Sequence, residues 1–324
     1  MKSTIPKFIN RHLALGLTLA LGLALLEPAL APAPAEACFF WQACARRRGR
    51  ASNTRAGGKR TGFIRGGNNP AVPYVITPRN TWIGEPPEMI RWNAVAGASR
   101  YTVRLWHWAY GRNAPNFVLW ETTVEGTNEV TFPDLALELG TYYSIEVIAE
   151  GVNRGGVSSN LDEGVYYAGF QLLSAEDYDL LRSHLAEVNA DNASAPAEAA
   201  ALAQAGVYFL DELYAEALQR LEPLTLNPAV SELVYIALGD TYSETGLNQL
   251  AVGAYEQALS IAMANDDILS EAIIMVKLAD VYLTLGDFEQ ARQLLIQARE
   301  AYSQLGAQLE VSIVDRRINV LSRL

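Results

Sequence analysis

The spacing of hydrophobic residues changes near residue 170, and this change separates two regions of the chain. From 70 to 170, short runs of Val, Ile, Thr, Tyr and Trp are punctuated by Gly, Pro and Asn. Alternation of apolar and polar positions is typical of strands that bury one face. In RYTVRLWHW the inward set is Tyr101, Val103 and Leu105, and the outward set is Arg104, Trp106 and Trp108. The pattern predicts a small antiparallel β-sandwich over residues 70–170.

A second alternating segment, LELGTYYSIEVIAEG, turns at Gly140 and directs Tyr143, Ile145, Val147 and Ala149 inward. We expect Trp92 to lie in the core of the same sandwich. The region resembles a fibronectin type III or related immunoglobulin-like domain, and the residues that carry the resemblance are Trp92, Tyr101, Val103, the Leu137, Gly140 and Tyr143 turn, and Gly156 with Ser158. The resemblance implies a spacer or binding module, because a fold by itself does not specify chemistry.

From 171 to 324 the apolar residues follow helical spacing, and the pattern repeats. Three tyrosines recur at separations of 34 and 40, and three alanines recur at the same separations: Tyr208, Tyr242 and Tyr282, and Ala217, Ala251 and Ala291. A repeat of this length is typical of two-helix units that bury their apolar faces only by stacking on one another. The sequence therefore predicts a multidomain chain, in which an all-β sandwich precedes an all-α solenoid.

The second unit shows the pattern most completely. Its first helix carries Tyr235, Leu238, Gly239 and Tyr242, Gly246 makes the turn, and its second helix carries Ala251, Tyr255 and Ala258. This unit resembles the tetratricopeptide repeat (TPR). The third unit matches through Leu278, Tyr282, Gly286, Ala291 and Ala298, and the first through Tyr208, Ala217 and Leu221, with Glu212 where the turn glycine belongs. We expect flanking helices at 174–190 and 308–322 to cover the apolar ends of the stack.

The resemblance also implies a binding surface, because TPR proteins hold ligands along an inner face made by the first helix of each unit. The corresponding positions are Ile236, Asp240, Ser243 and Glu244 in the second unit and Val276, Lys277, Asp280 and Thr284 in the third. Some TPR proteins hold a terminal carboxylate with an array of basic residues, and of that array only Lys277 is present here. We therefore expect the ligand not to be an acidic terminus, and we expect Asp240 and Asp280 to favour a basic or polar segment of a protein or peptide. The alternative is that these acids only keep the protein soluble.

The amino terminus has the layout of a secretory signal peptide. Lys2, Lys7 and Arg11 precede an apolar run from Leu13 to Leu26, and small residues lead to Ala37. This run is shorter than the roughly 20 residues that span a bilayer. We expect residues 1–37 to be removed and the mature chain to be periplasmic or extracellular, without a transmembrane span.

Both cysteines, Cys38 and Cys44, follow the expected cleavage site. Exported thiols oxidise, so we expect a disulfide between them. A lipid anchor on Cys38 is disfavoured by Ala35 and Glu36 before it, and two thiols without a neighbouring His cannot complete a tetrahedral metal site. Residues 38–69 are rich in Arg and Gly and predict a flexible basic arm.

Charge is uneven along a chain whose net charge is −11. Residues 38–84 carry nine Lys or Arg and no acid, whereas 171–324 carry 23 acids and eight bases. The arm from Arg46 to Arg65 is thus one candidate ligand for the acidic repeats. The export signal argues against nucleic acid as its target.

Catalysis is not indicated by the sequence. Beyond the leader, the chain retains only His107 and His184, and neither has the spacing of a metal site or a catalytic triad. We expect a non-catalytic scaffold without cofactor or metal. The alternative is a glycan-binding sandwich in which Trp106, Trp108 and Trp120 stack on sugar rings.

Overall fold

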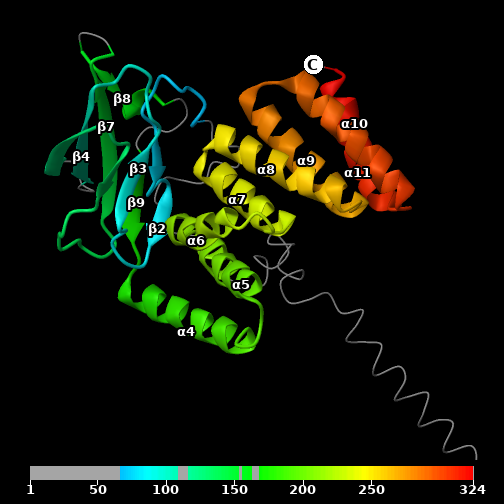
Figure 1. The fold of residues 1–324 in the computed structure, drawn as a ribbon, viewed down its shortest axis with the longest axis horizontal. Helices are drawn as coiled ribbons and strands as arrows, with labels where there is room; N and C mark the ends of the chain where they lie inside the picture. The colour runs from blue at the N-terminus through cyan, green and yellow to red at the C-terminus, as the bar shows by residue number, and fades with distance from the viewer. Residues whose placement is uncertain (1–65, 109–115, 153–154, 163–167, 324) are drawn as a thin grey trace, which may run out of the picture. The chain divides into compact units, whose positions relative to one another are not determined.

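Strands make up the first half of the described chain and helices the second (Figure 1). The computed structural model describes residues 66–108, 116–152, 155–162 and 168–323. The strands are β1 (Val75–Thr77), β2 (Thr81–Ile83), β3 (Met89–Trp92), β4 (Arg100–Trp108), β5 (Phe117–Glu125), β6 (Glu129–Thr131), β7 (Tyr142–Glu150), β8 (Val157–Ser158) and β9 (Ala168–Leu172). The expected signal peptide and most of the expected basic arm, with Cys38 and Cys44, lie outside the described residues.

Two sheets contribute side chains to one core. The first sheet has the order β1-β3-β6, and the second has the order β2-β9-β7-β4-β5, with β8 paired to β7. The core joins Val75 and Trp92 of the first sheet to Val103, Ile145 and Phe170 of the second. The region is not purely antiparallel, because β2 runs parallel to β9.

The predicted inward faces of the long strands are correct. Tyr143, Ile145, Val147 and Ala149 are buried, and Trp92 is 0% exposed. The hydroxyl of Tyr143 accepts a 2.8 Å hydrogen bond from the backbone N–H of Glu138. Immunoglobulin-like domains have a comparable tyrosine corner. The last strand, β9, continues to Leu172, two residues past the expected boundary at 170.

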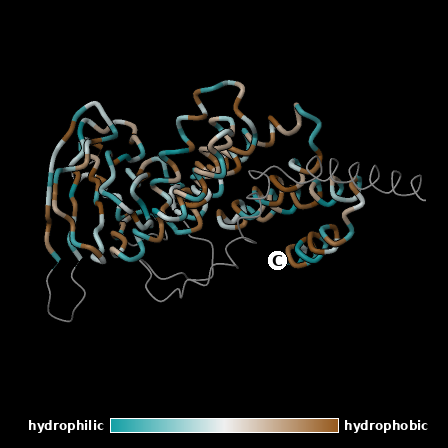
Figure 2. The backbone as a smooth tube through the Cα atoms, turned by 90° about the horizontal axis from the view of Figure 1, so that it is seen from below, coloured by the Kyte–Doolittle hydropathy of each residue, from teal (hydrophilic) through white to brown (hydrophobic). Residues whose placement is uncertain are grey.

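The helical region consists of stacked helix pairs. Its helices are α4 (Ala175–Asp191), α5 (Ala197–Leu210), α6 (Tyr214–Leu221), α7 (Glu232–Thr245), α8 (Asn248–Ala264), α9 (Ile268–Leu285), α10 (Phe288–Gln304) and α11 (Gln308–Leu321). Short 3-10 helices lie at Ser159–Leu161 and Glu222–Leu226. Figure 2 shows apolar and polar stretches alternating along this region, as expected for helices that bury one stripe.

The turn between the two helices of each unit uses one left-handed residue. Gly246 has φ 76° and Gly286 has φ 83°, whereas Glu212 has φ 63° at the equivalent place in the first unit. A residue with a side chain is costly in this conformation. Tertiary contacts hold Glu212 there, because its carbonyl accepts hydrogen bonds from the Trp82 backbone N–H at 3.0 Å and the Thr81 hydroxyl at 3.1 Å.

The second unit packs a small residue against a large one between its two helices. In the second unit a Cβ on Gly239 would lie 2.5 Å from the Tyr255 ring, so only glycine fits there. At the same repeat positions the other units pair Ala205 with Leu221 and Ala279 with Leu295, and these side chains are buried. The second unit thus combines the smaller Gly with the larger Tyr, whereas the other two combine Ala with Leu, and this exchange of volume keeps the interior close-packed.

The final helix of the described chain, α11, has the repeat pattern on the side that faces α10 and exposes both polar and aliphatic side chains elsewhere. Val314 is buried, and α11 contacts α10. Where α9 has the buried Ala272 and Ala279, the equivalent repeat positions of α11 carry Ser312 and Asn319, which are exposed. This agrees with the expectation that a flanking helix covers the end of the stack. Among the described residues, no helix is long and apolar enough to cross a membrane.

Candidate functional site

The first helices of successive units are joined by two equivalent ion pairs. Lys277 Nζ on α9 lies 2.7 Å from Asp240 Oδ1 on α7. One unit further, Arg317 on α11 pairs with Asp280 on α9. The partners have the same sequence separation, 37, in both pairs, and the second pair follows the first by one repeat period. The pairs therefore repeat with the units and place α7, α9 and α11 side by side along one surface, which we call the inner face.

Both inner-face acids are held within the chain. Asp240 accepts a 2.5 Å hydrogen bond from the Tyr255 hydroxyl in addition to that from Lys277. Burial raises the pKa of Tyr255 well above its usual value, and the nearby Asp240 carboxylate adds to this rise. Burial also raises the pKa of Asp280, whereas the Arg317 guanidinium opposes that rise. Asp240 and Asp280 are thus both engaged by side chains of the same chain.

This arrangement corrects the expected selection of a basic ligand by these two acids. Within the described chain, Lys277 and Arg317 already occupy the sites beside Asp240 and Asp280 where a ligand cation was expected. A basic ligand would have to displace a tethered cation and would gain little net electrostatic energy. Arg317 was missed in the sequence, although it occupies the position of Lys277 one repeat later and could have been found from the repeat period.

Other predicted inner-face residues differ in accessibility. Ile236 and Thr284 are buried, so their side chains are unavailable to a ligand. The Thr284 hydroxyl donates a 3.0 Å hydrogen bond to the Asp280 carbonyl, a common way for a helix to satisfy threonine. Ser243 and Val276 are half-buried, and Glu244 is exposed. Three of these five side chains, those of Ser243, Glu244 and Val276, are therefore accessible to a ligand.

An aliphatic row on the same face was missed in the sequence. Leu233, Ile273 and Ile313 recur at the repeat period, and each lies four residues before Ala237, Lys277 or Arg317. Residues four apart share a helix face, so the row runs beside the ion pairs. Leu233 and Ile273 are half-buried, and Ile313 is 42% exposed. The repeat period is the signal that could have revealed the row.

A buried arginine of the sheet region, Arg79, forms a hydrogen bond to the repeats. The Arg79 side chain is 1% exposed, and its Nη2 lies 2.7 Å from Asp162 Oδ2. Its Nε donates a 2.8 Å hydrogen bond to the Thr245 carbonyl at the end of α7. Burial lowers the pKa of Arg79, and the Asp162 carboxylate opposes this change. A cation at a helix carboxyl end is also favoured by the helix dipole.

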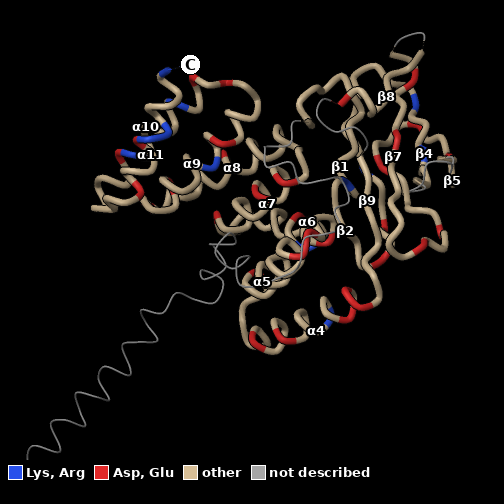
Figure 3. The backbone as a smooth tube through the Cα atoms, turned by 180° about the vertical axis from the view of Figure 1, so that it is seen from behind, with Lys and Arg blue, Asp and Glu red and all other residues tan. Residues whose placement is uncertain are grey.

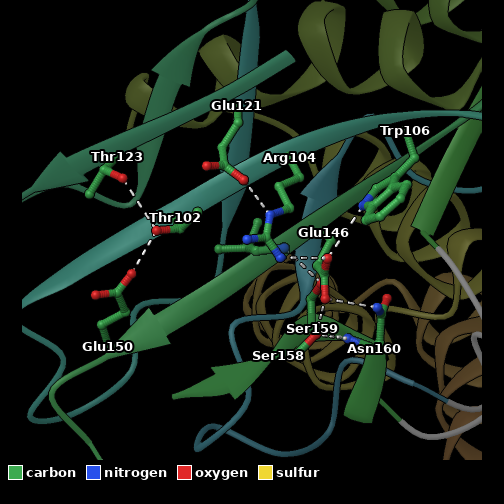
Figure 4. Close-up of polar contacts among 11 residues, drawn as sticks. Thr102, Arg104, Trp106, Glu121, Thr123, Glu146, Glu150, Ser158, Ser159 and Asn160 are labelled. Atoms are coloured by element: carbon green, nitrogen blue, oxygen red, sulfur yellow. Dashed lines mark hydrogen bonds and ion pairs between the residues drawn. The ribbon is translucent and has the colours of Figure 1, made fainter. Parts of the chain in front are cut away.

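The outer face of the second sheet carries a polar network around Arg104 (Figure 4). Arg104 Nε lies 2.5 Å from Glu121 Oε2, and its Nη1 lies 3.6 Å from Glu146 Oε2. The indole N–H of Trp106 donates a 3.3 Å hydrogen bond to Glu146, and that of Trp108 donates a 2.6 Å bond to the Ser144 hydroxyl. Both tryptophans are half-buried on this face.

Trp120 does not join the other two tryptophans. The β4–β5 ladder pairs Trp120 with Leu105, and a register shift after this pair brings Trp106 opposite Val118. Leu105 points into the core, and Trp120 packs against that core. The expected platform of three tryptophans is therefore incorrect, because Trp120 pairs with the inward-facing Leu105 and lies on the inner side of the sheet.

The two histidines occupy different surroundings. His107 stacks on Phe117 with ring centroids 4.8 Å apart, and its Nε2 lies 3.9 Å from Glu138 Oε2. Its buried Nδ1 has no hydrogen-bond partner within the described chain. His184 Nδ1 lies 3.8 Å from Asp211 Oδ2. Over the described ranges, no three His, Cys, Asp or Glu side chains are grouped to hold a metal ion.

The comparisons with known proteins identify part of the helical region. The tetratricopeptide repeat family matches residues 231–304, which include α7 to α10. No curated protein matches the chain. The chain is similar to the crystal structure of BtubC (BKLC) from P. vanneervenii, with 22% sequence identity and a TM-score of 0.36. That similarity covers 46% of this chain and 66% of the other, and so low a TM-score does not establish a shared arrangement.

Proposed function

We propose that the chain is an exported, non-catalytic scaffold that binds a protein or peptide partner through the inner face of its repeats. The observation that carries the proposal is the alignment of α7, α9 and α11 by the Asp240–Lys277 and Asp280–Arg317 pairs. These pairs lie beside a row of accessible aliphatic side chains. TPR motifs at 231–304 support a role in protein–protein interaction.

The sheet region serves as a spacer or accessory module in this proposal. Arg79 ties the end of α7 to Asp162, and Ala215 of α6 belongs to the core shared with the strands. These contacts favour a fixed orientation of the repeats relative to the sheets over a loose linkage. A partner on the inner face would then be presented in a defined direction from the sheets.

Export and the lack of catalysis rest on the sequence. The basic, apolar and small-residue regions of 1–37 support secretion to the periplasm or the extracellular space. No nucleophile, base and orienting group can be assembled from His107 and His184, which supports a binding role without cofactor. Nucleic acid is not a partner in this proposal.

Affinity capture from the envelope fraction of the source cells tests the proposed function. Full-length wild type is compared with Ile313→Asp and Val320→Asp on α11, and Leu226→Asp serves as the control because Leu226 is 86% exposed outside the first helices. Thermal unfolding confirms that all variants are folded. Capture of a protein that both α11 variants lose and the control retains supports the proposal. Equal capture by all four proteins contradicts it.

A glycan-binding sheet is the second candidate. It is favoured by the common face of Trp106 and Trp108 and by the Glu146 carboxylate beside Trp106. Sugars are commonly held by aromatic stacking together with polar groups. Titration of the full chain with envelope polysaccharides tests this candidate, which requires Trp106→Ala to abolish any binding.

A further inference from the structure

The accessible aliphatic side chains of the inner face are concentrated at the α9–α11 end. Ile273 on α9 is half-buried, whereas Ile313, Val320 and Leu309 on α11 are 42%, 61% and 66% exposed. Ile313 precedes Arg317 by four residues, and Val320 follows it by three, so both share its helix face. Because Arg317 pairs with Asp280 of α9, this face of α11 adjoins α9. We call Ile273, Ile313 and Val320 the aliphatic strip.

Cationic groups with remaining hydrogen-bond donors flank this strip. Lys277 has three N–H donors, and in the described part of the chain one of them bonds to Asp240. Arg317 uses Nη2 for Asp280. The exposed Arg316 donates from Nε to the Ser312 carbonyl, 3.3 Å away, and makes no ion pair with a described residue. Each guanidinium has five N–H donors, so both retain capacity for a carboxylate.

The balance of charge along the repeats favours the same ligand chemistry. Residues 171–276 carry seventeen acids and two bases, whereas 277–324 carry six acids and six bases. Figure 3 shows the basic residues of the helical region gathered towards α9, α10 and α11. An acidic ligand is repelled along the earlier helices, whereas the last helices are balanced in charge and present Arg316, which makes no ion pair with a described residue, beside the aliphatic strip.

We propose that the aliphatic strip binds a partner segment that carries both aliphatic side chains and carboxylates. The aliphatic groups pack on Ile273, Ile313 and Val320, and the carboxylates bond to Arg316 and Arg317. The inference rests on the proposed function and specifies its partner. It replaces the basic ligand expected from Asp240 and Asp280, because both acids already hold cations of the chain.

Selection of random 12-residue peptides on the immobilised full chain tests this proposal. Fluorescently labelled consensus peptides are then titrated against wild type, Ile313→Ser, Val320→Ser and Arg316→Gln. Leu226→Ser is the control for a lost exposed aliphatic side chain. A peptide of residues 46–65 is titrated in parallel, because the basic arm is the competing occupant.

The proposal predicts a consensus rich in Asp or Glu and in Leu, Ile or Val. Its affinity should fall about tenfold in each aliphatic variant, because each loses a buried apolar contact. It should fall about threefold in Arg316→Gln, as for an exposed ion pair, and change little in Leu226→Ser.

Three outcomes overturn the proposal. A consensus rich in Lys or Arg that Ile313→Ser weakens would refute the acidic chemistry and leave the proposed function intact. Tighter binding of the 46–65 peptide than of the acidic consensus would assign the strip to the arm. Failure to obtain any peptide that discriminates wild type from Ile313→Ser would reject the strip, and capture from the envelope fraction would still decide the proposed function separately.

Discussion

Replacement of Glu216 by Gln should remove a pH-dependent weakness at the junction of the sheets and the repeats. Glu216 Oε1 on α6 accepts a 2.8 Å hydrogen bond from the Gly84 backbone N–H, and its Oε2 is buried without a partner in the described chain. Burial raises the pKa of Glu216 from 4.5 to about 7, the Gly84 N–H opposes the rise, and the Glu85 carboxylate adds to it. The protonated carboxyl is therefore the form that the junction favours.

The sign of the pH effect follows from this raised pKa. The stability contributed by the neutral carboxyl is fully present below pH 4.5 and is lost as pH rises through about 7. Each unit of pKa difference corresponds to about 1.4 kcal/mol, so the free energy of unfolding should fall by about 3 kcal/mol between pH 4.5 and 9. Glu216→Gln keeps an acceptor for Gly84 and cannot ionise.

Urea unfolding followed by tryptophan fluorescence at pH 5, 7 and 9 measures this difference. The variant and wild type should differ by less than about 1 kcal/mol at pH 5, and the variant should be more stable by about 3 kcal/mol at pH 9. Glu300→Gln is the control, because the Glu300 side chain is 63% exposed. If the Glu216→Gln and wild-type stabilities change in parallel across this range, the buried-carboxyl explanation is refuted.

Three further predictions concern the packing of the two regions and the ion pair at their junction. Gly239→Ala should lower the free energy of unfolding by about 1–3 kcal/mol, because its Cβ would press on the Tyr255 ring. Adding Tyr255→Leu should recover part of that loss, since the third unit has Ala and Leu at the equivalent positions. The absence of any recovery in urea unfolding would contradict this packing. Trp92→Ala should cost about 3–5 kcal/mol and Trp106→Ala much less, as measured by calorimetry, and equal losses contradict the assigned strand faces. Arg79→Met should cost about 3–5 kcal/mol by leaving a buried carboxylate unpaired, and a neutral effect in denaturant unfolding would show that the junction does not need this ion pair.

The repeats could be predicted because their pattern is local and periodic. The tyrosines and alanines at separations of 34 and 40 specify both helices of a unit, and Gly246 marks the turn between them. By the same period, Lys277 and Arg317 occupy equivalent positions in successive units. Whether they pair with Asp240 and Asp280 depends on how neighbouring units align, which the pattern within one unit does not determine.

Long-range contacts and irregular pairings could not be predicted in this way. Arg79 reaches Thr245 across 166 residues of sequence, and no local pattern distinguishes it from the other bases before residue 84. Alternation gave the correct inward face for Tyr143, yet it could not place Trp120, because the face of β5 depends on which of its residues pair with those of β4. The junction and the tryptophan face therefore required the three-dimensional structure.

Site-specific photocrosslinking tests the central claim, that the inner face of the repeats holds a protein partner. A photoreactive amino acid is placed at Ile313, at Val276, or at the exposed control position Leu226, in the full chain expressed in its source cells. The account predicts the same adduct at Ile313 and Val276 and no such adduct at Leu226. An adduct of equal yield at Leu226, or none at the two inner-face positions, would contradict it.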